Sequence, residues 1–227
     1  MINYSDQRHA VSMKRISIII YTIFALLVSL VSSSVYAKEW AFDVFLDKTI
    51  IGEHTFKLAD NETLISQAKF NVKLLFINAY QYQHQAIEQW DKNCLKNLAS
   101  ETVENKVKTI VKGQRQTDTF EVSNGKENQN LPGCTMTFAY WNQKILEQSK
   151  LLNPQNAEFL DTSIKKLGNV VLDVKGKAID TLHYKLDASL NGKQKLNIEL
   201  WYRADNHEWV GLKSITPEGY QIYYKLK

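Results

Sequence analysis

The chain has 227 residues and a formal net charge of only +4, from 28 Lys and Arg against 24 Asp and Glu. Basic and acidic residues are interspersed, which argues against a nucleic-acid-binding surface. The low Pro and Gly content (3 and 9 residues) argues against a disordered or low-complexity chain.

The first 37 residues have the pattern of a secretory leader. Met13-Lys14-Arg15 is a basic start, residues 16–31 are almost wholly apolar, and Val35-x-Ala37 suits signal peptidase. We therefore expect translation to start at Met13, cleavage to follow Ala37, and the mature protein to be exported. The apolar run is slightly long for a signal, so an uncleaved membrane anchor is the alternative.

Residues 38–227 are expected to form a single β-rich domain without a transmembrane span, because apolar and polar residues alternate along most of them. The alternating segments are 40–46, 50–58, 68–74, 80–91, 181–189, 195–202, 208–215 and 220–226. Turn signals such as Asn191-Gly192 separate the last four. About ten such runs predict an antiparallel meander that forms a strongly curved sheet or an incomplete barrel.

One short helix is predicted at residues 142–152, where Ile145, Leu146, Ser149 and Leu152 recur at helical spacing. A single helix against a curved sheet would cover an otherwise exposed apolar face.

The two cysteines, Cys94 and Cys134, are expected to form a disulfide, because an exported protein folds in an oxidising compartment. The alternative is a reactive thiol, which needs a nearby base and a reducing environment. Leu131-Pro132-Gly133 is read as a turn, and residues 135–140 alternate as the next predicted strand.

The segment of residues 80–91 carries unusual polar groups among aromatic ones. If its aromatic face points inward, His84 and Glu88 point inward with it. Four residues along a strand span about 13 Å, so these two side chains cannot pair directly and a neighbouring strand must supply their partners. His54, on the apolar face of the predicted strand at residues 50–58, is the candidate.

Three interpretations of His54, His84 and Glu88 stay open. Aromatic walls with few polar groups are typical of a small-ligand pocket. The same side chains could instead be buried and hydrogen-bonded, fixing the register of the strands. They are also types that bind zinc, but no HExxH motif is present, and we expect neither a metal nor a cofactor.

Several motifs occur in an order that resembles a known family. They are IGEHTF (51–56), YQYQHQAIEQWDKNCL (80–95), LPGCTMTFAYWN (131–142), LLNPQNAE (151–158) and LWYRADNHEWVGLKS (200–214). The chain resembles an uncharacterised family of exported Gram-negative bacterial proteins, described as a domain of unknown function. The resemblance implies a periplasmic protein. It adds weight to His54, His84, Glu88, Trp90, Cys94, Cys134, Tyr140, Trp141 and Asn153. Residues 154–157 depart from the family pattern after Asn153.

The C-terminal segment, residues 198–226, is also similar to the last hairpins of periplasmic lipoprotein-carrier-like half-barrels. That similarity implies a long antiparallel sheet that holds acyl chains on its concave side.

The leading hypothesis is therefore a non-enzymatic protein that binds a hydrophobic or lipid-like ligand in the concave face of the sheet. The candidate ligand-binding residues are His54, Tyr80, Tyr82, His84, Glu88, Trp90, Tyr140 and Trp141. One alternative is an envelope enzyme of hydrolase type that uses His84 and Glu88 as an acid–base pair. Another is a structural envelope protein, and no particular protein partner is predicted.

Overall fold

The computed structural model describes residues 36–74, 77–216 and 218–227, so the predicted leader falls almost wholly outside the described part of the chain. In that part, fourteen antiparallel strands form one continuous sheet, and the prediction of a mainly β, meander-type fold is confirmed. No helix among the described residues has the length and apolar character needed to cross a membrane.

The strands follow one another with short connections. Their bounds are β1 Tyr36–Leu46, β2 Thr49–Ala59, β3 Thr63–Leu74, β4 Ile77–Asp91, β5 Cys94–Glu104, β6 Val107–Arg115, β7 Thr119–Ser123, β8 Asn128–Pro132, β9 Lys150–Leu152, β10 Phe159–Val174, β11 Lys177–Leu190, β12 Lys193–Arg203, β13 Trp209–Ile215 and β14 Gln221–Leu226.

The sheet is a meander whose first and last strands meet in its middle. Its order is β8-β7-β6-β5-β4-β3-β2-β1-β14-β13-β12-β11-β10-β9. Strand β1 pairs with β14 from Phe42 opposite Leu226 to Leu46 opposite Ile222. The predicted turn at Asn191-Gly192 joins β11 to β12 with positive φ at both residues (51° and 77°), the combination that a type I′ hairpin requires.

The sheet does not close into a barrel, and an extended inner segment, residues 133–149, spans its concave side. Near its start, the inner segment bonds to one arm of the sheet: the Leu95 N–H of β5 donates to the Thr135 carbonyl (2.9 Å). The next residue bonds to the other arm of the sheet, since the Leu152 N–H of β9 donates to the Met136 carbonyl (2.9 Å). Residues 135–136 of the inner segment are therefore hydrogen-bonded to both arms of the sheet.

The inner segment differs from both elements predicted for it. Residues 135–140 do not form a strand of the sheet, since their only ladder contact is a single bridge from Thr137 to Leu152. The predicted helix over 142–152 is only the 3-10 helix η1 at Gln143–Glu147, after which residues 150–152 join the sheet as β9. The apolar spacing that suggested a helix reflects burial of Ile145 (0% exposed) against the sheet rather than a long amphipathic face.

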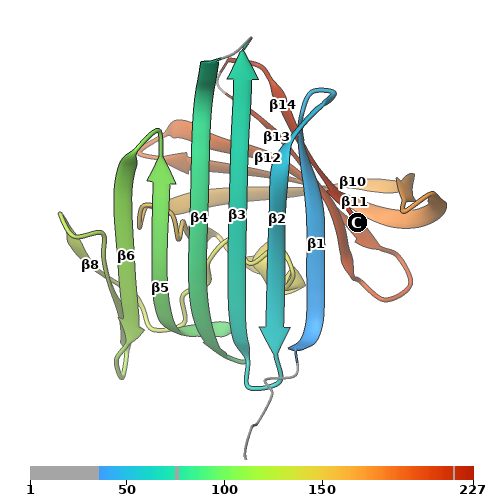
Figure 1. The fold of residues 1–227 in the computed structure, drawn as a ribbon. Coiled ribbons are helices and arrows are strands. Elements are labelled where there is room, and N and C mark those ends of the chain that lie inside the picture. Colours follow the sequence, from blue (N-terminus) through green and yellow to red (C-terminus); the bar gives the residue numbers. More distant parts are fainter. Residues whose placement is uncertain (1–35, 75–76, 217) are drawn as a thin grey trace, which may run out of the picture. The chain divides into compact units, whose positions relative to one another are not determined.

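Aromatic side chains fix the inner segment between the two arms. Trp141 packs against Trp40 of β1 (ring centroids 6.4 Å apart), and Tyr140 packs against Trp209 of β13 (5.4 Å). Trp209 also reaches Phe56 of β2 at 5.1 Å, so β2 and β13 face each other across the concave side. Figure 1 shows this arrangement, with β1–β6 as the near wall, the C-terminal strands behind them, and the yellow inner segment between.

The predicted disulfide is present: Cys94 and Cys134 are bonded, 40 residues apart in sequence. It lies where the inner segment begins, beside the bond from Leu95 to Thr135. The disulfide therefore anchors the inner segment covalently to the start of β5.

Replacing both cysteines by alanine should lower the free energy of unfolding by about 4 kcal/mol, because the unfolded chain regains the entropy of a loop of this length. Urea denaturation of the oxidised protein and of the double variant measures this difference. Equal midpoints would show that the disulfide does not anchor the inner segment.

Candidate functional site

The side chains of β4 alternate between the two faces of the sheet. Tyr82, His84, Glu88 and Trp90 are buried, with at most 7% of each exposed. The glutamines between them face solvent on the outer side. The whole polar-aromatic face of this strand therefore points into the concave side.

His54 and His84 lie in one row across the sheet, separated by Ala68 of β3. They do not bond to each other. The two ring nitrogens of His54 pair with the Ser66 hydroxyl (2.8 Å) and the Tyr224 hydroxyl (3.2 Å). His84 pairs through Nδ1 with the Thr102 hydroxyl (2.9 Å), so the partners of both imidazoles are hydroxyl groups from other strands of the sheet.

Burial keeps both imidazoles uncharged at neutral pH. Loss of hydration lowers the pKa of His84 to about 4. It also lowers the pKa of His54 well below its ordinary value, and the nearby His84 adds to the effect. A protonated ring at either position would be a buried cation whose hydrogen-bond partners are hydroxyl groups rather than a carboxylate.

Aromatic rings surround the two histidines and form what we call the basin: His54, Phe70, Tyr80, Tyr82, His84 and Tyr224. Phe70 stacks on Tyr82, with ring centroids 5.1 Å apart and planes 12° apart. Tyr82 is flanked along its own strand by Tyr80 (6.4 Å) and His84 (6.3 Å), both nearly parallel to it. Tyr224 of β14 meets Phe70 edge-on at 6.4 Å, so the rings come from both sides of the concave face.

The basin is apolar and partly open. His54, Phe70, Tyr80 and Tyr224 are only half-buried, whereas Tyr82 is 7% exposed. Burial raises the pKa of each tyrosine of the basin, and of Tyr140 next to it, above the ordinary value. Every titratable group of the basin is therefore neutral around pH 7.

Glu88 lies outside the basin, in an indole cluster that we define as Trp40, Trp90, Trp141, Thr137 and Glu88. The Trp90 Nε1–H donates to the Glu88 carboxylate at 3.1 Å. Trp141 packs edge-on against Trp90 at 5.5 Å. Burial raises the pKa of Glu88 to about 7, although Thr137 and the Trp90 indole both favour the ionised form.

The structure thus divides the residues predicted from the sequence into two neighbouring groups. His54, Tyr80, Tyr82 and His84 line the basin, with Tyr140 beside it, whereas Glu88, Trp90 and Trp141 form the indole cluster. Among the described residues, no group of three His, Cys, Asp or Glu side chains is placed to hold a metal ion.

Four residues of this region were missed by sequence reasoning: Ser66, Phe70, Thr102 and Tyr224. The inward direction of these side chains follows from strand alternation once the strand pairing is known. Ser66 and Phe70, for example, lie on the same face of β3 as Ala68. The pairing of β14 with β1, which brings Tyr224 to the basin, has no local signal. Asn153, singled out by the family resemblance, accepts the Gln155 N–H through its side chain (3.0 Å) and shapes a turn.

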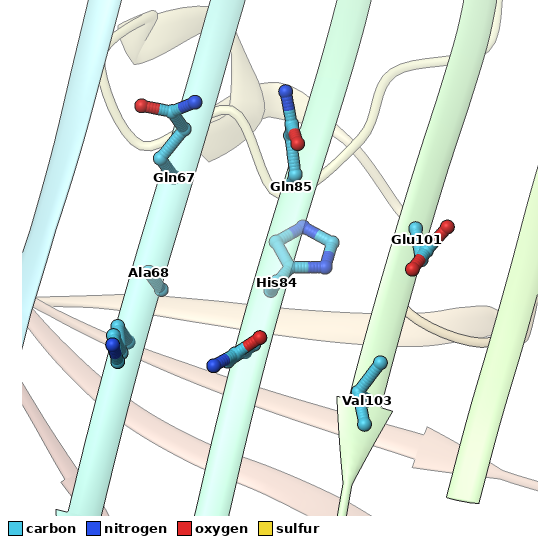
Figure 2. A pocket seen from close by; sticks show the side chains of 8 residues that line it. Gln67, Ala68, His84, Gln85, Glu101 and Val103 are labelled. Carbon is cyan, nitrogen blue, oxygen red and sulfur yellow. The ribbon is translucent and has the colours of Figure 1, made fainter.

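A separate hollow of about 330 Å³ lies on the outer side of the same strands (Figure 2). It is lined mainly by outward-facing polar side chains, among them Gln67, Gln85 and Glu101. Because this hollow is polar and open to solvent, it lacks the mostly apolar, enclosing walls of a ligand pocket.

A comparison with protein families finds a match over residues 42–227, to the family described as Domain of unknown function (DUF6134). The matched range contains the basin, the disulfide and all of the indole cluster except Trp40. A comparison with curated proteins finds no match.

Replacing Glu88 by glutamine should change the free energy of unfolding, relative to wild type, in favour of the variant at pH 8 compared with pH 5. The folded protein holds the Glu88 proton up to a pKa of about 7, whereas the unfolded chain releases it near 4.5. The folded state therefore loses stability as pH rises between these values, by about 3 kcal/mol in all, and Glu88→Gln lacks this loss. Urea unfolding of the wild-type protein and of Glu88→Gln at pH 5 and pH 8 gives the comparison. Both proteins contain His54 and His84, so any titration of the histidines affects the two alike.

The quantity to follow is the stability difference between variant and wild type. The free energy of unfolding of the variant minus that of the wild type should increase between pH 5 and pH 8. A difference that is the same at both pH values would mean that Glu88 is not buried in a neutral form.

Proposed function

We propose that this chain, which belongs to the DUF6134 family, binds a hydrophobic or lipid-like ligand in the basin on the concave face of its sheet. The observation that carries the proposal is the chemistry of the basin. It combines stacked, half-exposed aromatic rings with imidazole and hydroxyl groups that are all uncharged near neutral pH.

An apolar ligand would gain from such a surface in two ways. The half-buried faces of Phe70, Tyr80 and Tyr224 still contact water, and covering them contributes roughly 25 cal/mol per Å². The neutral imidazoles and hydroxyls offer hydrogen bonds at fixed positions, and such polar groups orient a ligand in a mostly apolar site. An anionic ligand would find no opposite charge in the basin, and the Glu104 carboxylate lies close enough to help raise the pKa of Tyr80 and Tyr82.

The geometry gives less support to an enzyme that uses His84 and Glu88 together. His84 bonds to Thr102 and Glu88 to Trp90, and the two lie in different groups. The pair of His54 and Ser66 resembles a base beside a nucleophile, but a histidine whose pKa lies far below its ordinary value is a weak base. We therefore favour binding over acid–base catalysis.

The proposal includes an exported, periplasmic location. It rests on the leader pattern of residues 13–37 and agrees with the disulfide, which persists in oxidising compartments.

The test is binding of the uncharged fluorescent probe N-phenyl-1-naphthylamine to the purified, oxidised chain. Wild-type protein should bind it with enhanced fluorescence. Phe70→Ala should weaken binding about tenfold, because the ring at the centre of the basin is lost. Lys69→Ala, which alters the next residue on the outer face, should bind like wild type.

Circular dichroism checks that each variant is folded, and Phe70→Leu replaces Phe70→Ala if the alanine variant is not. Saturable binding that is equally strong in the Phe70 and Lys69 variants would place the ligand elsewhere. No binding to the wild-type protein would contradict the proposed function.

A further inference from the structure

Strands β2 and β3 part before their ladder reaches the end of the sheet. Their pairing stops at Gly52 opposite Phe70, although β2 begins at Thr49 and β3 continues to Leu74. A hollow of about 710 Å³ lies where the two strands part, and we call it the side opening. Half of the residues that line it are apolar, namely Leu46, Ile50, Ile51 and Val72, and most of the others belong to the turn between β1 and β2. Figure 1 shows this turn at the same end of the sheet as the end of β3.

The side opening adjoins the basin. Val72 follows Phe70 by two residues on the inward face of β3, about 7 Å along the strand, and pairs with Tyr80 of β4. On β2 the inward position between the side opening and His54 is Gly52, which has no side chain to close the way. Phe70, Tyr80 and His54 are themselves only half-buried. Accessible apolar surface therefore continues from the side opening into the basin.

The turn beside the side opening is bound to the turn between β13 and β14. The Asp47 N–H donates to the Gln221 carbonyl (2.7 Å), and the Gln221 N–H donates to the Asp47 carboxylate (3.0 Å). Three large apolar side chains are exposed around these two turns, and we call them the apolar tip: Ile50 (57% exposed), Tyr220 (52%) and Ile215 (39%). Ile215 pairs with Gln221 itself. Apolar side chains that are exposed together, rather than scattered singly, mark an interaction surface.

The charges of the two turns do not explain what the apolar tip contacts. The turns carry Asp47, Lys48 and Glu218, all exposed, and so have no excess of positive charge. A partner of the tip is therefore recognised by apolar contact. A phospholipid bilayer offers such contact, because its interfacial region takes up aliphatic side chains and the amphipathic ring of tyrosine. A bilayer is also the place where a lipid-like ligand of the basin is dissolved.

We propose that the apolar tip rests on the surface of a phospholipid bilayer, and that the ligand passes between the bilayer and the basin through the side opening. This inference rests on the proposed function. It adds the surface on which the protein docks and the route by which the ligand enters.

The first test measures flotation of the oxidised protein with vesicles of dioleoylphosphatidylcholine, which carry no net charge. Wild-type protein should bind the vesicles, and about 0.5 M NaCl should not weaken binding, because salt screens charges rather than apolar contacts. Ile50→Thr/Tyr220→Ser should weaken vesicle binding about tenfold, since apolar area that contacts the bilayer is lost. Binding of N-phenyl-1-naphthylamine without vesicles should stay as in wild type.

Val171→Thr is the matched control, because Val171 is 61% exposed on β10, opposite Asp180 of β11 and away from both turns. It should bind vesicles like wild type. Retained binding of the probe shows that each variant is folded. If the double variant is not folded, Ile50→Thr alone takes its place and should weaken vesicle binding about threefold.

The second test addresses the route of entry. Val72→Trp narrows the side opening and should slow the association of N-phenyl-1-naphthylamine in stopped-flow fluorescence, while flotation with vesicles is unchanged. An association rate equal to that of wild type would place the entry elsewhere and overturn the route.

Wild-type protein that binds the probe but does not float with vesicles would overturn the membrane contact and leave the basin standing. Flotation that is lost at about 0.5 M NaCl would show adsorption through charged groups and would overturn it as well. The same holds if Val171→Thr weakens flotation as much as the double variant does. Failure of the wild-type protein to bind the probe at all would remove the basin and its entry route together.

Discussion

The rest of the structure depends on the backbone contacts that the inner segment makes with both arms of the sheet. A fourteen-stranded meander has two free ends and an apolar concave face that must be covered. Residues 133–149 bond to Leu95 on one side and to Leu152 on the other, and the Cys94–Cys134 disulfide fixes where they begin. The chain thus covers its own concave face with a segment that is neither a regular strand nor a long helix.

This covering also divides the concave face chemically. Where the inner segment packs against the sheet, the side chains form a closed core around Trp209 and Phe42, whose ring centroids lie 4.4 Å apart. Beyond Tyr140 the face stays partly open and becomes the basin. Burial then decides the charge of the polar groups, because imidazoles without a carboxylate partner remain neutral, and Glu88 binds its proton more tightly than an exposed glutamate. The neutral chemistry of the site follows from the packing of the fold.

Much of this fold is readable from the sequence, because strand alternation is a local signal. The runs at residues 40–46 and 80–91, and the hairpin at Asn191-Gly192, are found where the pattern predicts them. The inward direction of His84 and Glu88 follows from the same two-residue period.

What the sequence does not show is set by long-range contacts. In the inner segment, alternation over residues 135–140 predicts a strand and the spacing over 142–152 predicts a helix, whereas the actual conformation is set by contacts with the two arms of the sheet. The partners of His54, namely Ser66 and Tyr224, depend on strand pairing, and Tyr224 lies 170 residues away in the chain. The split of His84 and Glu88 into two groups likewise appears only in three dimensions.

The most direct test of the central claim, that the basin on the concave face binds a hydrophobic or lipid-like ligand, is native mass spectrometry of the full, disulfide-bonded chain. The account predicts a bound species that organic solvent releases from the protein. A protein that is detected only at its bare mass under gentle conditions, and stays at that mass after incubation with lipids, would contradict it.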